Sequence, residues 1–150
     1  MKELTGHAER TTSAARERIM SLLEAVDQYP SWYPRVVKSV EVLERNDQGR
    51  PTKARAKLHV EHGPLTRDFN LLMQVQVDPT GGTVKLSRIP HEGADTEKFD
   101  VIWRVAGAGL SQIRLDLAAN LSIPRFLPLG DVGESLAAGF VNAAMRQLGA

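Results

Sequence analysis

One arginine in the chain occupies a position where its charge needs an explanation. From residue 65 to residue 77 apolar and polar side chains alternate, and Arg67 falls on the apolar side, next to Phe69. A buried guanidinium is costly unless it is paired or hydrated. Arg67 therefore either binds a ligand carbonyl, enol or carboxylate through two parallel hydrogen bonds, or lies at the open end of its strand and extends to water or an acidic residue. Arg88 supports the same argument more weakly, in a shorter strand.

The second candidate is the run Asp27-Gln28-Tyr29-Pro30-Ser31-Trp32-Tyr33-Pro34, which concentrates three aromatic residues in a chain that is only 5% aromatic. Exposed rings would be unfavourable, so we expect this segment, which we call the aromatic corner, to cover a core or the mouth of a cavity. Pro30 and Pro34 restrict the backbone, and we expect them to end the preceding helix. Trp32 and Tyr33 either close an apolar cavity as a rigid lid or anchor the corner to a sheet.

Other kinds of active site have little support in the sequence. The chain has no cysteine, which excludes disulfides, thiolate metal sites and cysteine nucleophiles. His59 and His62 are three residues apart, but His59 lies in a predicted strand and no third ligand is evident. Residues 130–134 lack the lysine of a phosphate-binding loop, and no Gly-x-Ser-x-Gly sequence occurs. We therefore expect no metal and no cofactor.

Bulk properties narrow the class of protein. The net charge is +1 and the basic residues are scattered, which argues against DNA binding. The N-terminus lacks the apolar core of a signal peptide, and no apolar run approaches the roughly 20 residues that cross a bilayer. With 150 residues, of which 42% are hydrophobic, the chain suits one domain over residues 1–150. We expect a cytoplasmic protein without a transmembrane segment.

Periodicity predicts the elements that position these residues. Residues 3–11 alternate weakly and predict a short strand, and Ser13 is the expected N-cap of a helix that reaches residue 26. After the aromatic run the period changes to two, and turn residues separate about six strands between residues 36 and 121. From about Asp131 to the end the helical period returns, with apolar residues every three to four positions.

This order predicts an α+β fold in which a curved antiparallel sheet of about seven strands wraps around a long C-terminal helix. Strands joined by hairpin-length turns form an antiparallel sheet, and its apolar face needs a cover. Small residues occur on the strands at Ala54, Ala56 and Ala119 and on the helix at Ala137 and Ala144. They either leave a hollow between the two layers or let the helix sit closer to the sheet.

Order and motifs together resemble the START-like, or SRPBCC, helix-grip superfamily. The resemblance rests on the helix at 16–26, the aromatic run at 27–34, Val40-Glu41-Val42-Leu43-Glu44-Arg45, and Leu121-Ser122-Ile123-Pro124-Arg125-Phe126 before the last helix. It covers nearly the whole chain and is closest to the polyketide cyclase/dehydrase and lipid-transport branch, which includes coenzyme Q-binding and ribosome-association-toxin proteins. The helix of such proteins usually opens with a small-proline-small sequence, whereas Ser13-Ala14-Ala15 has no proline.

The resemblance implies a deep apolar cavity between the sheet and the C-terminal helix. Its ligand would be a lipid, an isoprenoid quinone or a polyketide-like molecule. We expect ligand contacts from the inner strand faces, the helix and the aromatic corner, namely from Trp32, Tyr33, Arg67, Phe69, Leu71, Met73, Trp103, Leu117, Leu136, Phe140 and Ala144.

Three functions fit these expectations. The leading hypothesis is a binding protein or carrier without catalysis, because the inward strand faces offer no evident acid/base pair. The alternative is a polyketide aromatase/cyclase in which Arg67 and Tyr33 polarise a carbonyl for ring closure and loss of water. A further alternative is a ribosome-associated interaction protein, although the scattered charge argues against binding ribosomal RNA. The sequence leaves the ligand and the oligomeric state open.

Overall fold

The computed structural model describes residues 2–62, 65–90, 97–107, 110–121 and 131–149. Its elements in chain order are strand β1 (Lys2–Thr12), helix α1 (Arg16–Glu24), the 3-10 turn η1 (Val26–Gln28), the short helix α2 (Tyr29–Trp32), strands β2 (Val37–Arg45), β3 (Pro51–His62), β4 (Leu65–Asp78), β5 (Thr83–Arg88), β6 (Lys98–Ala106) and β7 (Ser111–Leu121), and helix α3 (Val132–Gln147). The part of the family resemblance carried by residues 122–126 lies outside the described residues.

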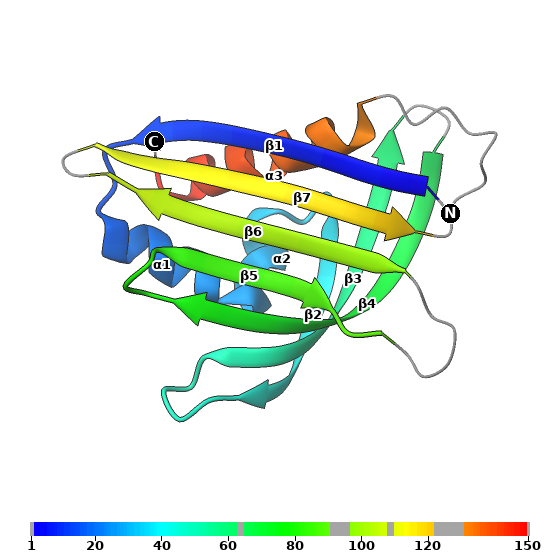
Figure 1. The fold of residues 1–150 in the computed structure, drawn as a ribbon, viewed down its shortest axis with the longest axis horizontal. Coiled ribbons are helices and arrows are strands. Elements are labelled where there is room, and N and C mark those ends of the chain that lie inside the picture. The colour runs from blue at the N-terminus through cyan, green and yellow to red at the C-terminus, as the bar shows by residue number, and fades with distance from the viewer. Residues whose placement is uncertain (1, 63–64, 91–96, 108–109, 122–130, 150) are drawn as a thin grey trace.

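The strands form one antiparallel sheet in the order β1-β7-β6-β5-β4-β3-β2 (Figure 1). Strands β2 to β6 each pair with the next strand in the chain, as is usual for consecutive strands of an antiparallel sheet. The N-terminal strand β1 pairs with β7, where Gly6 lies opposite Leu117. The predicted α+β fold, with a seven-stranded curved sheet and a long C-terminal helix, is confirmed.

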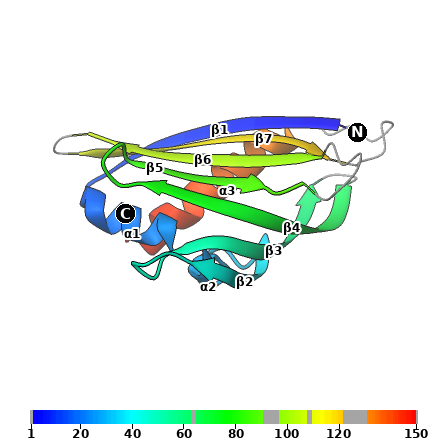
Figure 2. The same cartoon turned by 60° about the horizontal axis from the view of Figure 1, so that its bottom comes forward.

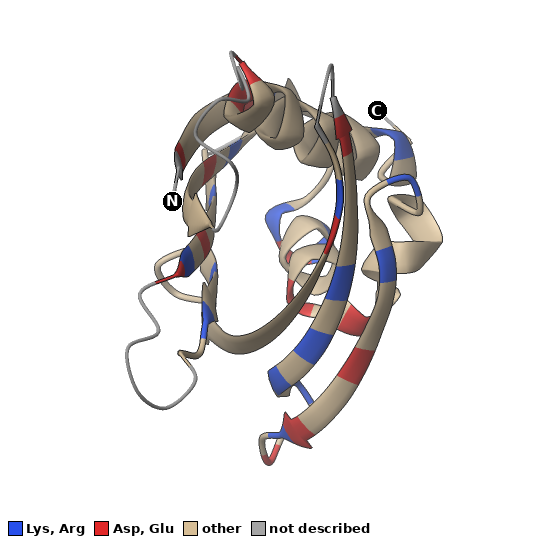
Figure 3. Ribbon diagram, turned by 90° about the vertical axis from the view of Figure 1, so that its right-hand side faces the viewer, with Lys and Arg blue, Asp and Glu red and all other residues tan. Residues whose placement is uncertain are grey.

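The helices all lie on the concave face of the sheet (Figure 2). Viewed from one end, the sheet bends into an open curve with helical segments along its inner side, and basic and acidic residues are interspersed along the strands (Figure 3). The inner face is the apolar one: on β7, for example, Ile113, Leu115 and Leu117 are buried. Within the described residues, no helix is long and apolar enough to cross a membrane.

Helix α3 comes very close to the sheet where two glycines meet. A Cβ atom on Gly6 of β1 would overlap the carbonyl group of Gly133, and one on Gly133 would overlap the carbonyl group of Thr5. Only glycine permits backbones to come this close. The helix packs mainly against β1 and, to a lesser extent, β7, so it is held at one edge of the sheet.

Two local predictions around α1 are wrong. Ser13 does not cap the helix: α1 begins at Arg16, its N-cap is Ala15, and the side chain of Thr12 instead accepts a 3.2 Å hydrogen bond from the Ala14 amide. Pro30 does not end α1, which already ends at Glu24; it lies in the first turn of α2. Proline is tolerated there because the first amides of a helix have no intrahelical acceptor.

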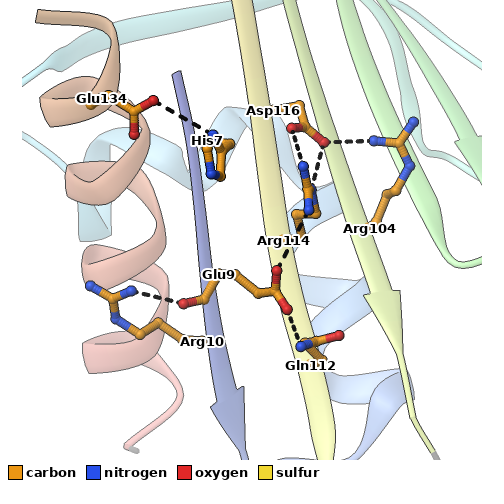
Figure 4. A network of polar contacts seen from close by, with 8 residues as sticks. All are labelled: His7, Glu9, Arg10, Arg104, Gln112, Arg114, Asp116 and Glu134. Atoms are coloured by element: carbon orange, nitrogen blue, oxygen red, sulfur yellow. Dashed lines mark hydrogen bonds and ion pairs between the residues drawn. The ribbon is translucent and has the colours of Figure 1, made fainter. Parts of the chain in front are cut away.

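The outer face of β1, β6 and β7 carries charges that are paired with one another (Figure 4). Asp116 accepts hydrogen bonds from Arg104 at 2.7 Å and from Arg114 at 3.0 Å. Arg114 also lies 3.6 Å from Glu9. Exposed pairs of this kind add little to stability, so the network mainly satisfies its own charges.

Candidate ligand-binding site

An apolar pocket lies on the concave side of the sheet. Its volume is about 40 Å³. It is lined by side chains from η1, α2, five strands and α3: Val26, Tyr29, Val37, Val40, Ala54, Ala56, Leu58, Leu71, Met73, Val75, Leu86, Phe99, Val101 and Phe140. We call this space the inner pocket.

The inner pocket lies away from the edge where α3 meets the sheet. Its strand residues come from β2 to β6, whereas α3 packs on β1 and β7. The two groups of small residues therefore have different roles. Ala137 and Ala144 are fully buried without lining the pocket, while Ala54 and Ala56 of β3 line it. The small residues of β3 therefore border a hollow, whereas those of α3 are packed in the core.

A second, larger space opens between α3, the aromatic corner and the end of β3. Its volume is about 540 Å³, and it is lined by Trp32, Tyr33, Pro34, Arg35, Val36, His59, Val60, Glu61, Val132, Ser135, Leu136, Gly139, Asn142 and Arg146. We call it the outer cleft. Its α3 residues Ser135, Gly139, Asn142 and Arg146 follow at spacings of four, three and four, so they share one face of the helix.

Two aromatic rings stand between the inner pocket and the outer cleft. Tyr33 lines the cleft and Phe140 lines the pocket, and their ring centroids are 4.7 Å apart in an edge-on arrangement. Trp103 supports Phe140 from the sheet side at 6.3 Å. Gly139 lets Tyr33 lie flush against α3, because a Cβ there would overlap the Tyr33 hydroxyl. The Tyr33–Phe140 pair thus lies where the walls of the two spaces meet, and we call it the partition.

The aromatic corner is mostly buried, as predicted. Tyr29, Trp32 and Tyr33 are at most 7% exposed. The Tyr29 hydroxyl donates a 2.5 Å hydrogen bond to the Leu23 carbonyl, and burial raises the pKa of this phenol far above its usual range. Tyr29 therefore presents its ring to the inner pocket, with its polar atom already satisfied.

Near the rim of the outer cleft, His59 of β3 is flanked by two carboxylates. Its Nδ1 lies 2.6 Å from Asp68 of β4, and its Nε2 lies 3.5 Å from Glu61. The hydrogen bond with Asp68 is the main reason that the pKa of His59 is raised. The same bond lowers the pKa of Asp68. His59 therefore carries a proton over a wider pH range than an isolated imidazole.

We predict that Asp68→Asn returns the pKa of His59 towards 6.5. Because the folded-state pKa of His59 is raised, the pair stabilises the fold fully below pH 6.5, and this contribution disappears as the pH rises through the raised pKa. At acid pH, the lowered pKa of Asp68 acts in the opposite direction. Its contribution to stability is fully present above pH 3.8 and is lost as the pH falls through the lowered, folded-state pKa. An NMR titration of the His59 ring measures the shift.

Glu61→Gln is the comparison variant for this titration. Glu61 ranks below Asp68 among the causes of the raised His59 pKa, so its removal should lower that pKa less. A His59 pKa that is unchanged in Asp68→Asn would contradict the assigned pairing.

Six of the eleven predicted ligand contacts line one of the two spaces. Leu71, Met73 and Phe140 lie in the wall of the inner pocket, and Trp32, Tyr33 and Leu136 in that of the outer cleft. Phe69, Trp103, Leu117 and Ala144 are buried but line neither space. Whether any of these residues touches a ligand stays a prediction.

Of the two alternatives for Arg67, the structure shows the exposed end of the strand. Arg67 is exposed, although Phe69, Leu71 and Met73 on the same side of β4 are buried. Its guanidinium carbon lies 5.7 Å from the centre of the Phe69 ring. Alternation assigns Arg67 to the correct side of β4. The end of the strand that carries Arg67 is not covered, however, so its side chain reaches water. Arg88 donates a 3.0 Å hydrogen bond to the Glu97 carbonyl.

Several polar residues of the outer cleft were not identified from the sequence. On α3, the polar positions Ser135, Asn142 and Arg146 share a helical face beside the apolar one, and that spacing was a usable signal. Arg35 offered none, because it follows Pro34 in an irregular segment. Its position relative to Arg146 depends on the tertiary fold.

Comparisons with known proteins agree with this fold. The polyketide cyclase/dehydrase and lipid transport family matches residues 12–147, whereas a search among curated proteins gives no match. A START superfamily protein from Mycobacterium smegmatis has a similar structure, with a TM-score of 0.76, 16% identity and 97% of each chain covered. A Thermus thermophilus protein follows with a TM-score of 0.72, 16% identity and 96% of each chain covered.

The Zhui aromatase/cyclase from a Streptomyces species shares the fold at a TM-score of 0.56 and 17% identity, over 99% of this chain and 87% of that one. Identities this low establish the fold alone. The family match spans nearly the whole chain and includes every residue that lines the inner pocket or the outer cleft. This chain therefore belongs to the polyketide cyclase/dehydrase and lipid transport family, and its fold is START-like.

Proposed function

We propose that the protein binds a hydrophobic small molecule between the sheet and α3 and releases it unchanged. A lipid, an isoprenoid quinone and a polyketide-like molecule are the candidate ligands. The observation that carries this proposal is the inner pocket, whose wall is apolar apart from the satisfied hydroxyl of Tyr29. Such a wall provides affinity through burial of apolar surface. Family membership supports a role in binding hydrophobic ligands or in cyclase-type chemistry.

Ligand entry requires the partition to move. The inner pocket offers about 40 Å³, whereas pockets for small molecules occupy roughly 300–1,000 Å³. The adjoining outer cleft adds about 540 Å³. Rotation of Tyr33 and Phe140 would join the two spaces, and side-chain rotation on binding is common. We therefore propose that the ligand's apolar part displaces these rings and enters the inner pocket from the cleft.

A cyclase role has weaker support. It needs a group that moves protons beside the apolar wall, and among the described residues that line the inner pocket only Tyr29 can ionise. Burial raises the pKa of Tyr29 and its hydroxyl is already bonded. Arg67, one of the two candidates for polarising a carbonyl, lines neither space. Binding without reaction is therefore the function we propose.

Native mass spectrometry of the purified protein, followed by organic extraction, tests the proposal directly. A co-purifying lipid, quinone or polyketide would support it and identify the class of ligand. A ligand that returns from the protein chemically altered would contradict the non-catalytic role.

We predict that Ala56→Phe abolishes binding of a neutral apolar probe, N-phenyl-1-naphthylamine. Ala56 is half-buried and lines the inner pocket, so a phenyl group there occupies the space that the probe needs. The matched control is Lys57→Phe, which adds the same ring to the exposed, opposite side of β3. Fluorescence titration should show binding for the native chain and for Lys57→Phe only. Equal binding by both variants would place the probe elsewhere.

A further inference from the structure

Two arginines from distant parts of the chain line the outer cleft. Arg35 follows the aromatic corner directly, and Arg146 lies in the last turn of α3. Both charges act on the same group, because each of them lowers the pKa of the Tyr33 hydroxyl, against the larger opposing effect of burial. Tyr33, Arg35 and Arg146 all line this one space, so both guanidinium groups face the cleft in which a ligand head group would lie.

Neither arginine has an ion-pair partner within the described part of the chain. The contrast with the outer face of the sheet is clear, since Arg104 and Arg114 there each reach a carboxylate within 3.0 Å. In the cleft the acidic residue is Glu61, and it pairs with His59 at 3.5 Å. His59 is also bonded to Asp68 and has a raised pKa, so with His59 protonated these three neighbouring groups together carry one net negative charge, against the two positive charges of the arginines. Arg35 and Arg146 supply the excess positive charge.

Neutral hydrogen-bonding groups line the same space. Ser135 and Asn142 lie on the face of α3 that also carries Arg146. The Tyr33 hydroxyl rests against Gly139 and is the polar end of the partition. A guanidinium donates paired hydrogen bonds to carboxylate and phosphate oxygens, and hydroxyl and amide groups complete such a site.

We propose that the natural ligand is an amphiphile whose apolar tail enters the inner pocket and whose oxyanion head, a carboxylate or a phosphate, is held in the outer cleft by Arg35 and Arg146. This inference rests on the proposed function, because it assigns the head group to a ligand whose tail the inner pocket takes up. The partition lies between the two spaces, so one molecule that displaces it reaches both. Head-group charge would then decide which apolar molecules are retained.

The test compares decanoate, decyl phosphate and decan-1-ol, which share one tail and differ in the head. Each ligand displaces N-phenyl-1-naphthylamine from the native chain and from the double variant Arg35→Gln/Arg146→Gln, in 150 mM salt. The control variant Arg10→Gln/Arg55→Gln removes the same charge from exposed positions that do not line the cleft. All three proteins are first compared by thermal unfolding.

The native and control proteins should bind the better of the two anions about tenfold more tightly than the alcohol, a modest factor because both arginines are exposed. The cleft variant should lose this preference while its affinity for decan-1-ol stays the same. The preferred anion identifies the head as carboxylate or phosphate. Equal affinity of the native protein for all three ligands would overturn the head-group inference alone. Failure to bind the probe or any of the three would overturn the proposed function, and the inference with it.

Discussion

Gly133→Ala is expected to destabilise the protein, although alanine is the better helix former by about 1 kcal/mol. The added Cβ would overlap the backbone carbonyl of Thr5, and backbone atoms cannot rotate away as a side-chain tip can. Overpacking of this kind costs about 1–3 kcal/mol, occasionally more. After the gain in helix propensity is subtracted, we expect a net loss of about 1–2 kcal/mol, which for a chain of this size lowers Tm by about 2–8 °C. Thermal and urea unfolding measure it.

Ser135→Ala is the matched control, because it lies two residues further along α3 on an exposed position and gains helix propensity without a clash. It should be neutral or slightly stabilising. Gly6→Ala should lower stability as Gly133→Ala does, since its Cβ would overlap the carbonyl of Gly133. The double variant should then cost less than the sum, because both changes push the same two backbones apart. A Gly133→Ala protein that is more stable than the native chain would contradict the close contact.

The same glycine contact positions α3 relative to the inner pocket. Helix α3 is held against β1 at Gly6 and Gly133, while the inner pocket opens over β2 to β6. The helix therefore lies close to the sheet at one edge and leaves room over the strands further away. Small residues are used at both places: Gly6 and Gly133 allow the close contact, and Ala54 and Ala56 on β3 line the pocket. A variant that separates α3 from β1 should affect ligand binding as well as stability.

Much of this fold could be predicted from the sequence because the signals are local. Alternation on β3, β4 and β7, turn residues between strands, and the helical period after Asp131 each depend on neighbours a few positions away. The aromatic corner was likewise identified from composition, and its burial was predicted correctly. Errors arose where a neighbour in space decides the outcome. Alternation assigned Arg67 to its side of β4 but could not show that this end of the strand is exposed to water.

The site was less predictable for the same reason. Leu71, Met73 and Phe140 follow from the apolar faces of their elements, whereas the outer cleft joins Arg35, His59 and Arg146 from three separate segments. No spacing in the sequence relates these three residues. The family resemblance did not supply them either, because it points to the cavity wall rather than to its rim.

Phe140→Ala is expected to speed ligand entry while weakening the fold. Phe140 is 5% exposed, and truncating a buried phenylalanine costs about 3–5 kcal/mol. The ring is also half of the partition beside Tyr33, at 4.7 Å. If binding requires an open state populated at about 0.1–10%, removing the ring should raise the association rate at least about tenfold. Stopped-flow fluorescence with N-phenyl-1-naphthylamine measures this rate, and thermal unfolding measures the stability.

Phe69→Ala separates the two effects, because Phe69 is also buried but lines neither space. It should lose comparable stability without any gain in association rate. Phe140→Leu provides a second variant that keeps most of the buried volume, in case the alanine variant folds poorly. It should show an intermediate rate at a smaller cost in stability. Equal association rates for Phe140→Ala, Phe69→Ala and the native chain would mean that the Tyr33–Phe140 pair does not control entry, and that the inner pocket fills by another route.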